Sequence, residues 1–315
     1  MKFSHLKGSL ILVLTAVIWG SAFVAQSVST GFIGTFTFNF LRSVLAMIVL
    51  LPVIFISDKI KARENKINGI VPASADRKKS GRTLLTAGVI CGVILFLAMA
   101  LQQEGLKYTT AGKAAFITTL YIVFVPIVGM FIGKKPGMSV WIAVTIAALG
   151  AYLLCISESF SIGFGDFLVF LCAVCYSAHI LVVDRFVDKI DGVQLSFVQF
   201  AVVAVLSVFP MFIAEKPDFV AISGAWLPVA YAGIMSSGVA YTLQIVGQKY
   251  TPVSIAPLIM SLESVFGAVF GALLLHEVLS DREILGCILI FIAVILAQTN
   301  FIDIALNRIF AKKRM

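Results

Sequence analysis

The chain carries one sequence pattern twice. The pattern Leu-Gln-x-x-Gly-x-Lys-Tyr-Thr occupies residues 101–109 and again residues 243–251, 142 positions later. Each copy lies in an apolar half of similar length, and five hydrophobic segments fit in each half. An odd number of spans would make the second half enter the membrane inverted relative to the first. We therefore predict two inverted five-helix repeats, 8–156 and 165–302.

The composition predicts an integral membrane protein. Hydrophobic residues make up 60% of the chain, charged residues only 13%, and the mean hydropathy is +1.04. A water-soluble protein of 315 residues could not bury that much apolar surface. The predicted fold is all-α, with ten transmembrane helices at 8–28, 33–56, 83–103, 109–132, 138–156, 165–183, 193–214, 227–246, 252–275 and 284–301.

The distribution of basic residues predicts the orientation. Of the 24 Lys and Arg residues, 19 fall in segments that such a topology places on one side, three fall on the other, and two lie within spans. Cytosolic segments are enriched in Lys and Arg, so both termini are expected in the cytosol and segment 57–82 is expected to form a basic cytosolic loop. The net charge of +8 then reflects topology in a plasma (inner) membrane and contact with lipid headgroups, and no nucleic-acid partner is expected.

Several short motifs along the chain resemble one transporter family. They are Trp19-Gly20-Ser21, Arg42, Tyr108-Thr109-Thr110-Ala111, Pro126 and His276-Glu277-Val278-Leu279-Ser280. With the duplication, they resemble the ten-helix EamA-like branch of the drug/metabolite transporter superfamily over residues 8–302. The resemblance implies transport of a small metabolite, such as an amino acid, sugar or nucleotide sugar, and favours export over uptake.

Three charged residues inside predicted spans are candidates for function. A charge near the bilayer centre costs about 2.5–3.5 kcal/mol, so it is retained when it is paired, faces water or serves a function. Glu263 is predicted near the midplane, as a proton-coupling carboxylate, a contact for a substrate cation or a structural group. Arg42, at similar depth, either binds a substrate anion or pairs permanently with Glu263. Lys113, nearer the outer surface, is either a gate contact or an interfacial anchor.

Aligning the two halves groups further residues at the same depth. Tyr121 aligns with Glu263, Trp19 with Tyr176, and Arg42 with Gln199. Inverted copies would bring these six side chains to one central cavity, whose lining suits a small polar or zwitterionic metabolite with an apolar part. The predicted substrate-binding residues are Trp19, Arg42, Lys113, Tyr121, Tyr176, Gln199, Tyr241 and Glu263.

The leading hypothesis is a secondary transporter, an exporter or exchanger, that works by alternating access. The alternative is a proton-coupled exporter of cationic drugs. The chain lacks the phosphate-binding motif of ATP-driven proteins and the nucleophile and zinc motifs of hydrolases, so no enzymatic activity, cofactor or metal is expected. A counter-ion or proton and a homodimer remain open as partners. The Gly-x-x-x-Gly pairs are interpreted as internal helix packing, and Pro126 and Pro257 as kinks.

Overall fold

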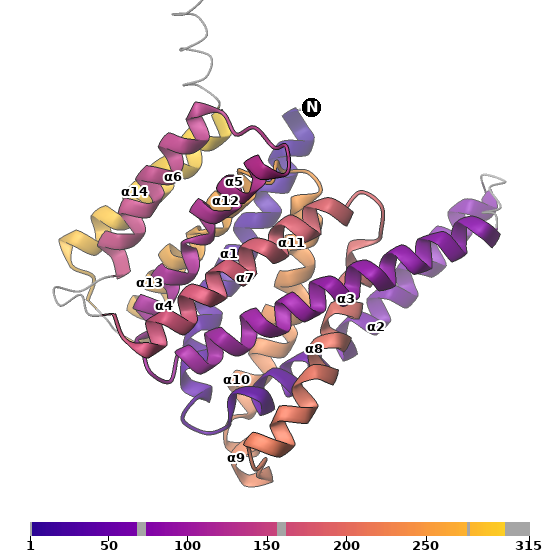
Figure 1. Cartoon of the computed structure of the whole chain (residues 1–315), viewed down its shortest axis with the longest axis horizontal. Coiled ribbons are helices and arrows are strands. Elements are labelled where there is room, and N and C mark those ends of the chain that lie inside the picture. The colour runs from indigo at the N-terminus through magenta and orange to yellow at the C-terminus, as the bar shows by residue number, and fades with distance from the viewer. Residues whose placement is uncertain (1, 68–73, 156–161, 276–277, 300–315) are drawn as a thin grey trace, which may run out of the picture.

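The computed structural model describes residues 2–67, 74–155, 162–275 and 278–299. Within these ranges the chain is helical apart from turns and short connections (Figure 1). The elements are α1 (Lys2–Ser29), α2 (Thr35–Ile67), α3 (Ser74–Gly105), α4 (Ala111–Thr119), α5 (Tyr121–Phe131), α6 (Met138–Cys155), α7 (Phe164–Phe186), α8 (Gly192–Ala214), α9 (Phe219–Gly224), α10 (Trp226–Tyr231), the π-helix η1 (Ala232–Ala240), α11 (Tyr241–Gln248), α12 (Ala256–Met260), α13 (Leu262–Leu275) and α14 (Asp281–Thr299).

Helices long and apolar enough to cross a membrane account for most of the described chain. Seven such stretches occur among the described residues: His5–Ser29, Thr35–Glu64, Ser80–Gly105, Lys113–Phe131, Phe164–Phe186, Gly192–Ala214 and Trp226–Gln248. Of the other three predicted spans, the fifth and ninth fall on the shorter apolar stretches Met138–Leu154 and Ala256–Phe270, and the tenth falls on α14. The protein is therefore an all-helical membrane protein, as its composition predicted.

The outer surface of the bundle is suited to lipid. Large apolar side chains point outward from several helices, with Phe131 85% exposed, Phe209 73% and Phe212 69%. So many large exposed apolar side chains are unusual for a water-soluble monomer and indicate contact with a membrane. These helices bury their small and polar residues inside the bundle instead.

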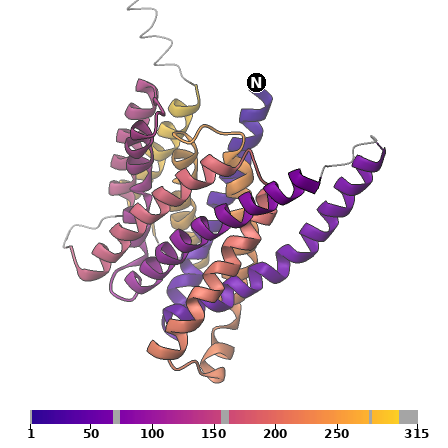
Figure 2. The same cartoon turned by 45° about the vertical axis from the view of Figure 1, so that its right-hand side comes forward.

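Helices from the two halves of the chain pack against one another. α6 lies along α14, α3 lies along α7 and crosses α8, and α1 crosses α11 and α13 (Figures 1 and 2). The Gly-x-x-x-Gly pair of α3 serves this packing, because Cβ atoms on Gly88 and Gly92 would lie 2.7 Å and 2.6 Å from the Cβ atoms of Val198 and Val202 in α8. This pair therefore packs within the chain, in agreement with the predicted internal helix packing.

The segment 57–82 differs from the predicted loop. α2 continues to Ile67 and α3 begins at Ser74, and the two helices extend beyond the bundle together (Figure 2). Residues 68–73, between them, lie outside the described part. The segment is rich in Lys, Arg and Ala, which are good helix formers, so its polar composition does not end the two helices.

Asp191 connects this extension to the start of α8. Its Oδ1 accepts hydrogen bonds from the backbone N–H groups of Val193, at 2.9 Å, and Gln194, at 3.2 Å, while Lys61 forms an ion pair with Oδ2. Partial burial acts to raise the pKa of Asp191, but Lys61 and the two N–H groups together hold this pKa below its ordinary value. The ionised form is therefore the one that caps the helix.

Asp191→Ala is expected to lower the free energy of unfolding by about 0.5–2 kcal/mol, and Asp191→Asn by less, since Asn also caps helices. The lowered pKa means that the charge-dependent stabilisation is present above the ordinary value of about 3.9 and is lost as the pH falls through the folded value. Unfolding in detergent should therefore show that wild type and Asp191→Asn converge in stability between pH 7 and pH 3. A difference that does not change with pH would contradict this expectation.

Candidate functional site

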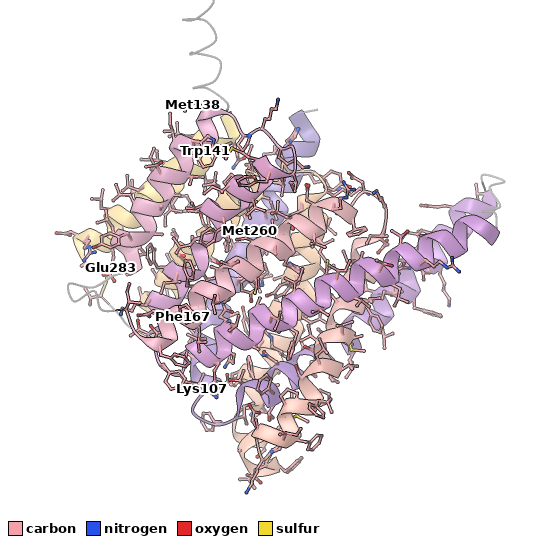
Figure 3. All side chains as sticks on the ribbon, viewed as in Figure 1. Lys107, Met138, Trp141, Phe167, Met260 and Glu283 are labelled. Atoms are coloured by element: carbon pink, nitrogen blue, oxygen red, sulfur yellow. The ribbon has the colours of Figure 1, made fainter. Side chains whose placement is uncertain are left out.

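A buried cavity lies at mid-height of the bundle, between helices of both halves. Its lining residues are Trp19, Phe23, Gln26, Arg42, Gln102, Thr118, Tyr121, Tyr176, Ile180, Ser236, Tyr241, Gln244, Met260 and Glu263. Figure 3 shows one of them, Met260, near the middle of the bundle, with Met138 and Lys107 toward opposite ends. The centres of water molecules can occupy about 40 Å³, room for about three waters. A metabolite must therefore be small, or the cavity must widen to admit it.

Six of the eight residues predicted to bind substrate line this cavity, and two do not. Gln199 is fully buried away from it, and its Oε1 lies 3.0 Å from Nε2 of His179. The prediction that Gln199 faces the cavity is corrected: its side chain is shorter than that of the aligned Arg42, and its oxygen already has a partner. Lys113 lines a separate cavity of about 230 Å³, because Asp166 at the start of α7 holds its ammonium group at 3.3 Å.

Arg42 is held in the cavity by neutral groups. The side chain is 2% exposed, and Nε donates to Oγ of Ser237 at 2.8 Å and Nη2 to Oγ of Ser236 at 3.1 Å. Nη1 donates to Oε1 of Gln26 at 3.3 Å. No ion pair joins Arg42 to Glu263 or to another acid in the described part of the chain. The permanent Arg42–Glu263 pair, one of two interpretations of the sequence, is therefore not formed in this conformation.

The π-helix η1 orients the consecutive residues Ser236 and Ser237 so that both accept hydrogen bonds from Arg42. A π-helix closes i→i+5 hydrogen bonds, so its turn is wider than that of an α-helix and consecutive side chains diverge less around the axis. Gly233 lets η1 approach α2 closely, since a Cβ there would lie 3.1 Å from the backbone oxygen of Arg42. Nothing in the apolar pattern of the eighth predicted span indicated this local geometry.

Glu263 and Tyr121 meet directly across the cavity. The Tyr121 hydroxyl donates to Oε1 of Glu263 at 2.9 Å, and both side chains are buried. Each follows an interruption in its span: Tyr121 follows Leu120, where α4 gives way to α5, and Glu263 follows Ser261, where α12 gives way to α13. Leu120 N–H bonds to the oxygen of Ile117, three residues back, so the turn is tightened.

These interruptions do not coincide with the two prolines interpreted as kinks. The helix is interrupted at Leu120, six residues before Pro126, and Pro257 lies in the first turn of α12, where its missing N–H costs nothing. Glu263 thus lies in the first turn of α13, at the end of the helix where the helix dipole favours a negative charge.

A chain of hydrogen bonds crosses the remaining wall of the cavity. The Tyr241 hydroxyl donates to that of Tyr176 at 3.0 Å, which donates to Oε1 of Gln102 at 3.3 Å, and Gln102 Nε2 donates to Oγ1 of Thr118 at 3.1 Å. Gln102 is not among the predicted substrate-binding residues. A signal for it was present, because Gln102 and Gln244 are the two glutamines of the repeated pattern, and both line the cavity.

Gly20, between two residues of the first motif, sets the crossing of α1 and α13. A Cβ at this position would lie 2.7 Å from both the backbone oxygen of Glu263 and the backbone nitrogen of Gly267. No side chain fits without moving one of the helices. Gly20 therefore holds Trp19 and Glu263 at their present separation.

Gly20→Ala is expected to lower the free energy of unfolding by about 1–3 kcal/mol, the cost of overpacking a tight contact, and to disturb the cavity. The matched control is Gly81→Ala in α3, where nothing lies within 4 Å. It should be neutral or stabilising by up to about 1 kcal/mol, since Ala is the better helix former. The measurement is the melting temperature in detergent, and wild-type stability of Gly20→Ala would show that the contact is not tight.

Apolar helices around a polar cavity near the middle of the bundle are typical of membrane transporters. The chain matches the model of the EamA-like transporter family twice, over residues 6–156 and 163–299. It therefore belongs to this family, and it is a multi-pass membrane transporter of a small molecule, not an enzyme. Of the motif at 276–280 that contributed to the resemblance, His276 and Glu277 lie outside the described residues.

Two further proteins are similar to the chain. An uncharacterized transporter of Archaeoglobus fulgidus is 30% identical over 299 residues, which cover 93% of this chain and 86% of that protein. A crystal structure with a TM-score of 0.72 covers 92% of this chain and 96% of its own. At 18% identity, the second likeness shows the fold alone.

Proposed function

We propose that the protein is a secondary transporter that exports or exchanges a small polar or zwitterionic metabolite, such as an amino acid, across the plasma membrane. The observation that carries this proposal is Arg42, a buried cation in the cavity whose hydrogen-bond partners are all neutral among the described residues. A buried charge without an opposite charge is costly, so an anionic group on the substrate would compensate it. Glu263, in the same cavity, suits a substrate ammonium group or a coupling proton.

The proposal includes two inverted five-helix repeats, residues 8–156 and 165–302. Equivalent contacts at opposite ends of the bundle support it. A Cβ on Gly8 would lie 3.0 Å from the oxygen of Gly247, and a Cβ on Gly165 would lie 2.7 Å from the oxygen of Gly105. The four positions are related by 157 and 142 residues, the offsets of the two halves. Tyr121 and Glu263, which also meet, are 142 apart.

Two acidic side chains at equivalent positions add to this support. Glu215, just after α8, accepts hydrogen bonds from the backbone N–H groups of Phe36 and Thr37 at the start of α2, both at 2.8 Å. Asp58, 157 positions earlier, accepts one from Nε2 of Gln194 at the start of α8, at 3.2 Å. Each half thus supplies an acid to the first turn of a helix in the other half, a favourable place for negative charge.

Alternating access would follow from rocking one repeat against the other around the fixed cavity. The interruptions at Leu120 and Ser261 occupy nearly equivalent places in the two repeats and are suited to act as hinges. The proposed orientation places both termini in the cytosol, on the basis of the excess of Lys and Arg in the segments of that side.

The test is the melting temperature of the purified protein against a panel of amino acids, sugars, organic acids, nucleotides and lipophilic cations, at two pH values. A substrate that binds the folded state raises its stability by about 2.7 kcal/mol at one hundred times its Kd. A shift with amino acids or related zwitterions, lost in Arg42→Ala or Glu263→Gln, would support the proposal. Shifts with sugars alone would overturn the predicted substrate class.

The second candidate function is a proton-coupled exporter of cationic drugs. Glu263 favours it, since no basic side chain pairs with this carboxylate in the described part of the chain, and Trp19, Tyr121, Tyr176 and Tyr241 supply aromatic surface. Arg42 argues against it, because its unpaired charge would repel a cation. A melting shift with tetraphenylphosphonium and with no zwitterion in the panel would favour this second function.

A further inference from the structure

Two glutamines of α11 form a hydrogen-bonded relay that ends at the cavity. Gln248 Nε2 donates to the backbone oxygen of Ile180 in α7 at 3.1 Å, and Gln244 Nε2 donates to Oε1 of Gln248 at 3.1 Å. Gln244 and Gln248 are 2% and 3% exposed, and Gln244 lines the cavity. Its remaining polar atom, Oε1, is buried and has no hydrogen-bond partner among the described residues.

The Ile180 carbonyl determines the direction of the whole relay. A backbone oxygen can only accept, so the amide of Gln248 must turn its NH₂ group toward Ile180 and its oxygen toward Gln244. The amide of Gln244 must then turn its own NH₂ group toward Gln248. Reversing either amide would oppose two oxygens or two NH₂ groups. The Ile180 carbonyl therefore fixes the orientation of Gln248, which in turn fixes that of Gln244 and leaves the Gln244 oxygen without a partner among the described residues.

A buried oxygen without a partner costs about 1–3 kcal/mol, unless a bound molecule supplies a donor. On the donor side, Trp19 Nε1 is also buried and unpartnered among the described residues, and the guanidinium of Arg42 lies in the same lining. The residues that line the cavity thus include donors, Trp19 and Arg42, and an acceptor, Gln244. This arrangement complements a molecule that carries both an acceptor group, such as a carboxylate, and an N–H donor.

We propose that Gln244 is a specificity-determining residue whose oxygen accepts a hydrogen bond from an N–H group of the substrate, and that Gln248 positions it. This inference rests on the proposed transport of a zwitterionic metabolite and goes further, since it assigns one residue to the recognition of the nitrogen. A site that holds an acceptor for this group discriminates against analogues that lack it, because the acceptor then stays unpaired.

The test uses pairs of molecules that differ in the amino group: leucine with 4-methylpentanoate, serine with 3-hydroxypropanoate, and glutamate with glutarate. The readout is the ratio of the two affinities, taken from melting-temperature shifts of the full-length protein. Wild type should prefer the amino acid of at least one pair. Gln244→Leu should reduce that ratio by about 10- to 100-fold, the value of one hydrogen bond to a charged group. Gln248→Leu should reduce it less, because the freed Gln244 amide still presents its oxygen part of the time.

The matched control is Gln103→Leu. Gln103 is equally buried and donates to the oxygen of Gln26 and to Ser29, but it does not line the cavity. Its replacement should lower the melting temperature and leave the affinity ratio unchanged. A ratio that falls as far in Gln103→Leu as in Gln244→Leu, or that stays unchanged in Gln244→Leu, would overturn the specificity role.

A second measurement needs no ligand. Either Gln244→Leu or Gln248→Leu breaks the bond between the two amides, so the double variant should lose less melting temperature than the sum of the single losses. Additive losses would overturn the relay. If no member of any pair stabilises wild type, the proposed substrate class fails, and the specificity role fails with it. A non-additive result would then still uphold the relay as structure, so the two failures are distinguishable.

Discussion

Arg42→Gln is expected to weaken binding of a substrate that carries an anionic group by about 30- to 5,000-fold, and binding of a neutral analogue much less. The reason is that Arg42 is the one basic side chain in the described lining, and removing one member of a buried charge pair costs about 2–5 kcal/mol. The measurement is the affinity of the reconstituted protein for the best metabolite of the panel and for its amide or ester. Equal losses for the charged and the neutral molecule would contradict a role in charge recognition.

Two further variants separate binding from folding at this position. Arg42→Lys keeps the charge but cannot reproduce the three hydrogen bonds to Ser236, Ser237 and Gln26, so an intermediate loss is expected. Adding Glu263→Gln to Arg42→Gln should not restore stability, because the two charges do not pair in this conformation. Restored folding in the double variant would instead identify a structural pair formed in another state of the transport cycle.

Glu263→Gln is expected to abolish proton-driven transport while exchange of substrate for substrate persists. Glutamine has the same shape and can still accept the hydrogen bond from Tyr121, but it cannot take up or release a proton. Net transport into or out of vesicles along a pH gradient should fall to the level seen without the gradient, because the variant cannot carry a proton with the substrate. Its dependence on pH between 5 and 8 should flatten.

Tyr121→Phe is the matched control for this prediction. It removes the hydrogen bond to Glu263 and leaves the titratable carboxyl group in place. The pH profile of transport should then shift along the pH axis without flattening. If Glu263→Gln transports at the wild-type rate across the whole range, the carboxylate is a structural group and a different group, or exchange alone, drives transport.

The same two substitutions distinguish the two candidate functions. A metabolite transporter should lose affinity for a zwitterion in Arg42→Gln, and it should lose its proton drive but keep exchange in Glu263→Gln. A cationic-drug exporter should bind its substrate more tightly in Arg42→Gln, because the repelling charge is gone, and should fail only in Glu263→Gln.

Sequence reasoning located much of the candidate site but not its internal contacts. The alignment of the halves grouped Tyr121 with Glu263, and these two side chains meet. The same alignment grouped Arg42 with Gln199, yet Gln199 binds His179 and lies away from the cavity. Depth in the membrane can be counted along a helix, whereas the direction of a side chain around the axis changes by about 100° with each residue. A small error in the rotation of a helix therefore exchanges lining residues for buried ones.

Polarity in the segment 57–82 was a poor guide to secondary structure. It predicted a loop, and most of the described part is helix, because basic and acidic residues disfavour lipid without disfavouring helical backbone. In the same way, the tightened turns at Leu120 and Ser261 and the π-helix at 232–240 leave the apolar pattern of a span unchanged. A hydropathy pattern therefore cannot predict these irregularities. They nevertheless determine where the side chains of Arg42 and Glu263 lie.

The sequence by itself determined that this chain is a helical membrane protein and a member of a transporter family, and it indicated which charges lie deep in the bilayer. Hydropathy and motif spacing are local properties that add up along the chain, so they need no tertiary information. Only the tertiary structure decided which polar atoms are paired and which are free: Arg42 with two serines and an amide, Glu263 with Tyr121, and the oxygen of Gln244 with no partner in the described structure. Those pairings depend on how helices cross that are up to about 200 positions apart in the sequence. A hydrogen bond of about 3 Å is lost if one helix is displaced by even one residue along the other.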